Sequence, residues 1–277
     1  QGMVCHETYK DDKGNWLYPD EVLKIDAKKF IKKIDKTKVL VGPSESMSKS
    51  KKNTIDPEKI IEIYGADAVR LFILSDSPPE KDVQWSDTGI SASFKFLQKL
   101  WSLNEKICKN KKKFTKFDEE LEKFSNQIIR KLSDDLGRFG FNVVIASIYK
   151  IYSFYNQQTN KEDWGSNFNK NYTNILKIIN PVIPHFSNEC LARLRQSVDN
   201  IKWPEIDQKY LEEEIINIVT QINGKKRKVF SVNKSIDKET LIKNIKNDEQ
   251  IQKYVDNKEI LKTIYIENKL INFIIKK

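Results

Sequence analysis

Several residue types and patterns are scarce in this chain of 277 residues, and each absence excludes a class of protein. The three cysteines, Cys5, Cys108 and Cys190, lie far apart without a Cys-x-x-Cys pair, which argues against a disulfide scaffold. The chain has only two histidines, so we expect no zinc site or other metal centre and interpret the adjacent Cys5 and His6 as incidental. No apolar run approaches the roughly 18 residues of a spanning helix, and no signal peptide is visible. We therefore expect a cytoplasmic protein without a membrane partner.

Charge of both signs is abundant, with a basic excess. Lysine and arginine number 49 against 39 aspartates and glutamates, which gives a net charge of +10. Lysine supplies 43 of these cations and arginine only 6, a skew typical of A- and T-rich codon usage, so part of the excess is compositional. A basic chain is compatible with a nucleic-acid partner but does not identify one. The length, with 39% hydrophobic residues, predicts two or three globular units rather than one.

The first part of the chain mixes brief strands with a polar, lysine-dense loop at residues 44–53. Asp56 followed by Pro57 predicts the start of a helix, because aspartate caps a helix and proline suits its first position. Gly65 predicts the end of that helix. A second helix is expected directly afterwards, capped by Asp67 and ended by a proline pair.

From about residue 87 the apolar residues recur at helical spacing, which predicts a helical bundle with a packed core. Four stripes carry this prediction: Ile90, Phe94, Leu97 and Trp101; Leu121, Phe124, Ile128 and Leu132; Val144, Ile148, Ile151 and Tyr155; and Ile183, Phe186, Cys190 and Leu194.

After an acidic run at residues 212–214 the pattern changes to that of a small α/β domain. Strands are predicted at residues 215–222 and 228–232 on either side of an Asn-Gly turn, the strongest short hairpin signal. A helical pattern follows at residues 238–254, and two closing strands are predicted at 263–267 and 270–275. This segment, from residue 215 to the end, holds 14 basic and 7 acidic residues, so most of the excess charge lies here.

The hairpin places four cations directly after its turn. Alternation along a strand predicts Lys226 and Lys228 on one face, with Lys225 and Arg227 on the other. Four adjacent cations cannot all be buried, so we expect an exposed basic edge suited to RNA phosphates.

The lysine-dense loop is the first candidate for chemistry. Hydroxyls, backbone amides and an ammonium between a strand and a capped helix can follow a polyphosphate as its charge redistributes. From spacing alone, a solvated run of lysines is the favoured interpretation.

The amino-acid sequence of this loop resembles a known signature. Residues 47–50, Met-Ser-Lys-Ser, resemble the second signature, Lys-Met-Ser-Lys-Ser, of class I aminoacyl-tRNA synthetases. Residues 65–70, Gly-Ala-Asp-Ala-Val-Arg, resemble the valine, isoleucine and leucine branch of that family. Three further stretches, residues 1–4, 134–138 together with 141–142, and 221–225, resemble leucyl-tRNA synthetases of the bacterial type.

The resemblance implies roles for the loop. Lys49 matches the second signature lysine, which contacts the ATP phosphates and stabilises charge as pyrophosphate leaves, so it is the implied catalytic residue. Met47, Ser48 and Ser50, with Lys49, are the implied ATP-binding residues. The implied cofactors are ATP and the Mg²⁺ that accompanies it.

The loop departs from the family at Ser46, which stands where the first signature lysine is expected. A hydroxyl cannot replace an ammonium. Either that contact is weaker here, or Lys51 or Lys52 supplies the charge.

The resemblance also implies a multidomain α+β fold in three parts. Residues 1–86 match the end of a Rossmann-like catalytic domain, with the signature loop and a stem-contact region. Residues 87–211 match a helical tRNA-arm domain of the anticodon-binding type, and residues 212–277 a small basic tRNA-binding α/β domain. The candidate tRNA contacts are Arg130, Lys131 and Arg138 in the bundle and Lys225, Lys226, Arg227 and Lys228 in the hairpin.

The first family signature, His-x-Gly-His, is missing, because His6 and His185 are the only histidines. The resemblance therefore implies the C-terminal part of a leucine enzyme, which acts on ATP, leucine and tRNA(Leu). The leucine pocket and the editing domain would belong to an N-terminal part, joined in cis or present as a separate subunit. We expect this chain alone to be inactive. A non-catalytic RNA-binding module and the equivalent part of a valine or isoleucine enzyme are the open alternatives.

Overall fold

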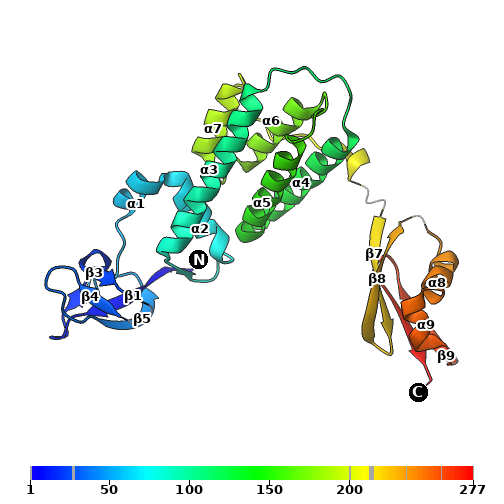
Figure 1. The fold of residues 1–277 in the computed structure, drawn as a ribbon, viewed down its shortest axis with the longest axis horizontal. Helices are drawn as coiled ribbons and strands as arrows, with labels where there is room; N and C mark the ends of the chain where they lie inside the picture. Colours follow the sequence, from blue (N-terminus) through cyan, green and yellow to red (C-terminus); the bar gives the residue numbers. More distant parts are fainter. Residues whose placement is uncertain are drawn as a thin grey trace. The chain divides into compact units, whose positions relative to one another are not determined.

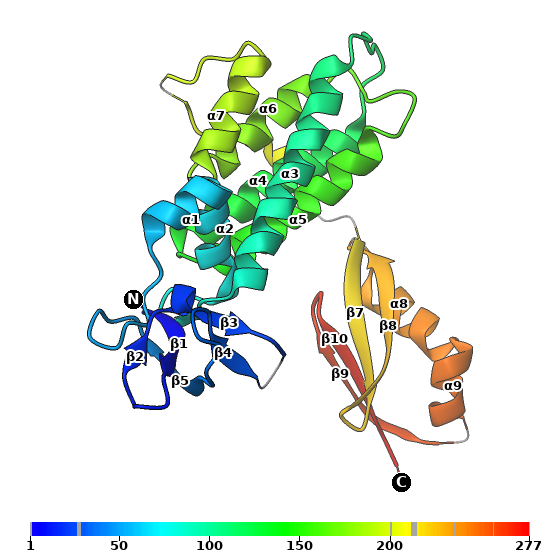
Figure 2. The same ribbon diagram turned by 60° about the vertical axis from the view of Figure 1, so that its left-hand side comes forward.

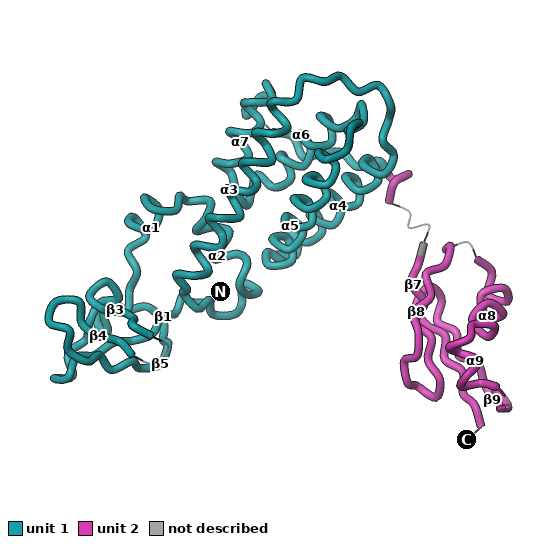
Figure 3. The backbone as a smooth tube through the Cα atoms, in the orientation of Figure 1, with its two compact units in different colours: residues 1–207 teal, residues 208–277 magenta. Residues whose placement is uncertain are grey.

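The structure forms two compact units, residues 1–207 and 208–277 (Figure 3). It is a computed structural model that describes residues 2–26, 29–199, 201–211, 215–234, 236–256 and 258–276. The predicted mixture of helices and sheets is confirmed. The predicted division into residues 1–86, 87–211 and 212–277 stays a prediction, and the acidic run at 212–214 lies outside the described residues.

The first unit begins with a small sheet built around β1 (Val4–Lys10) (Figure 2). Antiparallel partners of β1 are β2 (Trp16–Leu17) and β5 (Leu40–Ser46), and a parallel partner is β6 (Val83–Gln84). A short turn (Pro19–Glu21) leads into a separate hairpin of β3 (Val22–Lys24) and β4 (Phe30–Lys32).

The prediction of a loop over residues 44–53 is wrong in its first part, because β5 continues to Ser46. Ser44, Glu45 and Ser46 pair with Glu7, His6 and Cys5 of β1. Polar residues suit this strand because β5 lies at the edge of the sheet, where side chains reach solvent.

The two predicted helices follow, as α1 (Pro57–Tyr64) and α2 (Ala66–Asp76). Asp56 caps α1 as predicted, since its side chain accepts from the Glu58 amide. Gly65 separates the helices with φ of 79°, a backbone angle that glycine adopts without strain. The prediction that Asp67 caps α2 is wrong, because Gly65 occupies the cap position and Asp67 lies inside the first turn.

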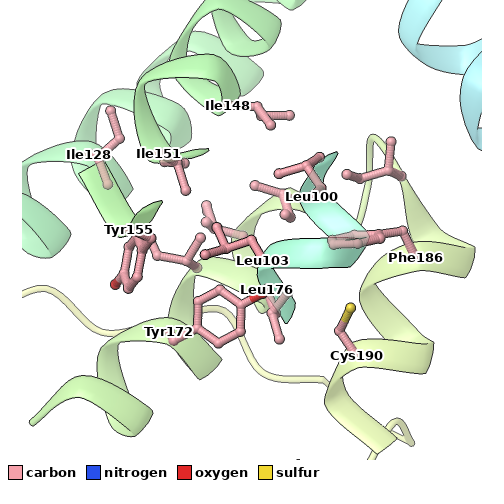
Figure 4. Close-up of a cluster of buried hydrophobic side chains, with 14 of the residues drawn as sticks. Leu100, Leu103, Ile128, Ile148, Ile151, Tyr155, Tyr172, Leu176, Phe186 and Cys190 are labelled. Carbon is pink, nitrogen blue, oxygen red and sulfur yellow. The ribbon is translucent and has the colours of Figure 1, made fainter. Parts of the chain in front are cut away.

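The described residues of this unit form five further helices: α3 (Asp87–Lys109), α4 (Glu119–Gly137), α5 (Phe141–Gln158), α6 (Phe168–Ile179) and α7 (Pro184–Arg193) (Figure 1). Their buried side chains meet in one core (Figure 4), where the labelled residues are Leu100, Leu103, Ile128, Ile148, Ile151, Tyr155, Tyr172, Leu176, Phe186 and Cys190.

The predicted stripes differ in accuracy. All four residues predicted for α5 are buried, and so are three of the four in α4 and in the α7 stripe. In α3 only Ile90 of the predicted stripe is fully buried, while Phe94, Leu97 and Trp101 are partly buried and pack against the cores. The buried face of this helix also carries Phe96, Leu100, Leu103 and Ile107. Helix α6 has no predicted stripe, because its buried face includes polar residues such as Asn171 and Thr173.

Helix α2 is tied to the chain around the start of α7. The Asp67 carboxylate accepts from the Phe186 amide at 2.7 Å. One turn later, Arg70 donates to the carbonyls of Pro181 and Val182 at 2.7 and 2.8 Å. These contacts connect α2, which follows the signature-like loop and α1, to the bundle.

Where the structure describes it, the second unit is a four-stranded sheet with two helices. Its elements are β7 (Ile215–Ile222), β8 (Lys225–Asn233), α8 (Lys238–Lys246), α9 (Glu249–Val255), β9 (Ile260–Ile266) and β10 (Leu270–Ile275), after a short turn at Gln208–Tyr210. The strand order is β8-β7-β10-β9, with β7 and β10 parallel. The predicted hairpin is confirmed, although β8 begins at Lys225. Asn223 and Gly224 both have positive φ, as a tight turn requires.

Candidate functional site

The signature-like loop starts from an anchored methionine. The Met47 amide donates to the Val4 carbonyl at 3.1 Å, which continues the pairing of β5 with β1. The Met47 side chain is partly buried against the apolar cluster that contains Phe72 and Trp85. The chain therefore enters the loop from a fixed position.

Residues 48–53 then form a closed turn. The Ser48 amide donates to Asn53 Oδ1 at 2.8 Å, and Ser48 Oγ accepts from the Lys51 amide at 3.3 Å. The hydroxyls of Ser48 and Ser50 lie 2.8 Å apart. Lys52 has φ of 55°, a left-handed conformation that reverses the chain before Asn53.

The three lysines of this turn have different surroundings. The Lys51 ammonium pairs with Glu45, and the Lys52 ammonium lies 5.2 Å from the centre of the Tyr18 ring. Lys49 is exposed, and its ammonium has no partner within the described ranges. A free ammonium on an anchored turn is suited to an incoming anion such as a phosphate.

Lys49 also lines a pocket of about 680 Å³. The pocket lies between the turn that contains Tyr18 and Asp20 and the start of α1 at Asp56. Its other lining residues are Pro19, Thr54, Ile55, Pro57, Lys59, Ile60 and Ile63.

Ser46 ends β5 and is exposed, with its hydroxyl 3.9 Å from the Cys5 sulfur. Lys51 and Lys52, the two residues expected to compensate for a missing lysine there, are engaged by Glu45 and Tyr18. They would have to leave these partners before they could serve a ligand.

The three candidate RNA contacts of the bundle have acidic partners within the chain. Arg130 pairs with Asp134 at 3.1 Å, and Lys131 with Asp135 at 2.5 Å. Arg138 also pairs with Asp135, whose side chain is only 1% exposed. Burial raises the pKa of Asp135, but hydrogen bonds from the two cations outweigh this effect and leave the pKa below its ordinary value. These cations therefore hold the end of α4, and their contact with RNA stays a prediction.

The hairpin cations are arranged differently from the predicted alternation. A bulge in the pairing of β7 with β8 leaves Arg227 as an extra residue between Lys226 and Lys228. Such a bulge breaks the two-residue period, so the prediction of alternate faces is wrong. Lys225 and Lys226 are exposed on β8, an edge strand.

The other two hairpin cations contact helix α9. Arg227 lies 4.1 Å from the Tyr254 ring centre, and Lys228 is 2.5 Å from a carboxylate oxygen of Asp248. The hydrogen bond from Lys228 lowers the pKa of Asp248. The pair Lys225 and Lys226 is therefore the freer part of the basic surface.

Two absences apply to the described part of the chain. No three side chains of histidine, cysteine, aspartate or glutamate come together there as a metal site. None of the helices described is long and apolar enough to cross a lipid bilayer.

Comparison with protein families finds two matches. Residues 36–86, which include the signature-like loop, α1 and α2, match the family described as tRNA synthetases class I (I, L, M and V). Residues 118–242 match the anticodon-binding domain of tRNA ligase.

Individual relatives agree with these matches. The chain is 36% identical to the leucine-tRNA ligase of Orientia tsutsugamushi and 38% identical to that of Rickettsia bellii, in each case over 99% of its own length. It spans only 33% of each of these enzymes.

A solved structure shows the same fold. The ternary LeuRS-tRNA-LeuAMS complex from Agrobacterium radiobacter K84 aligns with a TM-score of 0.69 and 20% identity. The alignment covers 84% of this chain and 31% of that chain.

Proposed function

We propose that this chain, related over 99% of its length to leucine-tRNA ligases, is the C-terminal part of such an enzyme. The complete enzyme would form leucyl adenylate from leucine and ATP with release of pyrophosphate, and would then transfer the leucyl group to the 3′ end of tRNA(Leu) with release of AMP. The observation that carries the proposal is this relationship combined with the free Lys49 ammonium on a turn that matches the class I family. The remaining part of the enzyme, in cis or as a separate subunit, would hold leucine and the rest of the ATP site.

In this proposal Lys49 is the catalytic residue of the chain. Negative charge increases on the departing pyrophosphate as the adenylate forms, and a preorganised ammonium stabilises that charge. Met47 anchors the turn, while Ser48 and Ser50 offer hydroxyls to the nucleotide. Ser46 would leave the first signature contact without a positive charge.

Magnesium would arrive bound to ATP. Mg²⁺ keeps several waters and is usually held by phosphates with one or two carboxylates, so it needs no dedicated protein cage. It would neutralise part of the phosphate charge.

The same proposal assigns tRNA binding to the bundle and to the terminal unit. The free cations Lys225 and Lys226 would make the main phosphate contacts of the hairpin, with Arg227 and Lys228 beside them. Arg130, Lys131 and Arg138 would reach RNA only from their ion pairs at the end of α4.

The tRNA part of the proposal is tested by binding of bacterial tRNA(Leu) to this chain. We expect affinity to fall as salt is added, because phosphate contacts release counterions. Changing Lys225 and Lys226 together to glutamine should reduce the slope of log K against log salt by about 1 to 2.

The matched control is glutamine at Lys243 and Lys253, two exposed lysines of α8 and α9. This variant removes the same amount of charge. Its slope of log K against log salt should fall less than that of the variant at Lys225 and Lys226. Equal effects of the two double variants would show that only net charge matters, and would remove the hairpin from the proposed RNA surface.

A further inference from the structure

Asn53 has an unusual set of hydrogen bonds for a residue in a lysine-rich turn. It is completely buried, with 0% of its surface exposed. Its Oδ1 accepts from the Ser48 amide at 2.8 Å, and its Nδ2 lies 3.1 to 3.4 Å from three backbone carbonyls. Those carbonyls belong to His6, Glu45 and Ser46.

These contacts join three segments through one side chain. His6 lies in β1, Glu45 and Ser46 lie at the end of β5, and Ser48 opens the turn. Asn53 itself closes the turn. Both ends of the segment that carries Lys49 are thus fixed to the same pair of strands.

The chemistry of the site requires an amide. A carboxamide accepts through its oxygen and donates through two N–H bonds, so it can satisfy the Ser48 amide and the strand carbonyls together. A carboxylate could accept but not donate, and a buried side chain that fails to satisfy these groups leaves them unpaired.

We infer that Asn53 is a positioning residue that sets where the Lys49 ammonium stands relative to the sheet. The inference rests on the proposed function for its effect on catalysis. Asn53 is too deeply buried to touch a ligand, so it acts only through the turn. Because a misplacement of about 1 Å can cost roughly 100-fold in rate, a loosened turn should impair catalysis even with Lys49 present.

The first test needs only this chain and does not depend on its function. Trypsin cleaves after lysine in locally opened segments, so the rates of cleavage after Lys49, Lys51 and Lys52 report opening of the turn. For Asn53→Ala we expect these rates to rise at least about 10-fold while the bundle stays intact.

The matched control is Asn104→Ala. Asn104 is also 0% exposed, but it lies in the bundle core, where its side chain accepts from the Tyr172 hydroxyl at 3.3 Å. This variant should lower overall stability without raising cleavage in the turn. If both variants raise it equally, or if Asn53→Ala leaves it unchanged, the inference is overturned.

The second test uses the complete enzyme and separates rate from binding. Asn53→Ala should lower the kcat of leucine-dependent ATP-pyrophosphate exchange about 10-fold or more, with the KM for leucine unchanged. Lys49→Ala is measured alongside. If Lys49→Ala lowers kcat and Asn53→Ala does not, the positioning role is overturned. If neither variant lowers kcat, the proposed function is contradicted, while the proteolysis result still reports on the turn.

Discussion

Replacing Lys49 with alanine in the complete enzyme is expected to lower the turnover of leucyl adenylate formation about 100-fold or more, the scale of a preorganised charge on a transition state. Lys49 is exposed and has no partner in the described residues, so its truncation leaves no buried group unpaired. The loss should therefore appear in rate rather than in stability. Leucine-dependent ATP-pyrophosphate exchange measures the first, and thermal unfolding the second.

The neighbouring lysines provide the control for this result. Lys51 pairs with Glu45 and Lys52 lies over Tyr18, so alanine at either position removes the same formal charge from the same turn. We expect smaller losses for both variants. An unchanged exchange rate in Lys49→Ala would return the turn to the interpretation of a solvated lysine run.

Deleting residues 208–277 should weaken tRNA charging much more than adenylate formation. These residues form a compact unit with its own core of buried side chains, including Ile218, Leu241 and Phe273, so the first unit can keep its fold without them. The deletion removes the basic hairpin but leaves Lys49 and its turn. Aminoacylation and pyrophosphate exchange, measured on the same preparation, give the comparison.

The two reactions also identify a failed experiment. Equal loss of both would indicate that the first unit no longer folds, which circular dichroism of the deletion variant checks. Full retention of charging would remove the terminal unit from the tRNA-binding surface.

Addition of salt to the intact enzyme should reduce tRNA affinity, because phosphate contacts release counterions.

The fold was predictable where a local rule decides the backbone. Asp56 caps α1 and Asn223-Gly224 makes the hairpin turn, because each depends on residues adjacent in sequence. The α5 stripe is buried on one face as its spacing predicts. Asp67 resembled a helix cap for the same local reason, but its hydrogen-bond partner lies more than a hundred residues further along the chain.

For the candidate site the sequence offers a prediction of the chemistry, which stays a prediction, but not of the geometry. The sequence around Lys49 indicated a phosphate-binding turn. Neighbouring residues in the sequence do not show that Lys51 and Lys52 already have partners. Asn53 was missed as a functional residue, because its role depends on carbonyls of two separate strands. The one signal in the sequence was the position of Asn53 itself, an amide side chain between a run of lysines and the residue that caps α1.

The charge pattern of the hairpin illustrates a similar limit. Strict alternation is the default for a strand, and it failed because pairing with β7 introduces a bulge near Arg227. Bulges depend on the partner strand and on tertiary packing. The ring of Tyr254, close to Arg227, comes from a helix that follows later in the sequence.

The most direct measurement is amino-acid-dependent ATP-pyrophosphate exchange by the complete enzyme and by this chain alone. The complete enzyme should exchange with leucine and only weakly with isoleucine or valine. This chain alone should show no exchange, because one anchored turn cannot position both an amino acid and ATP. Leucine-dependent exchange by the isolated chain, or a complete enzyme that prefers isoleucine or valine, would contradict its assignment as the C-terminal part of a leucine-tRNA ligase.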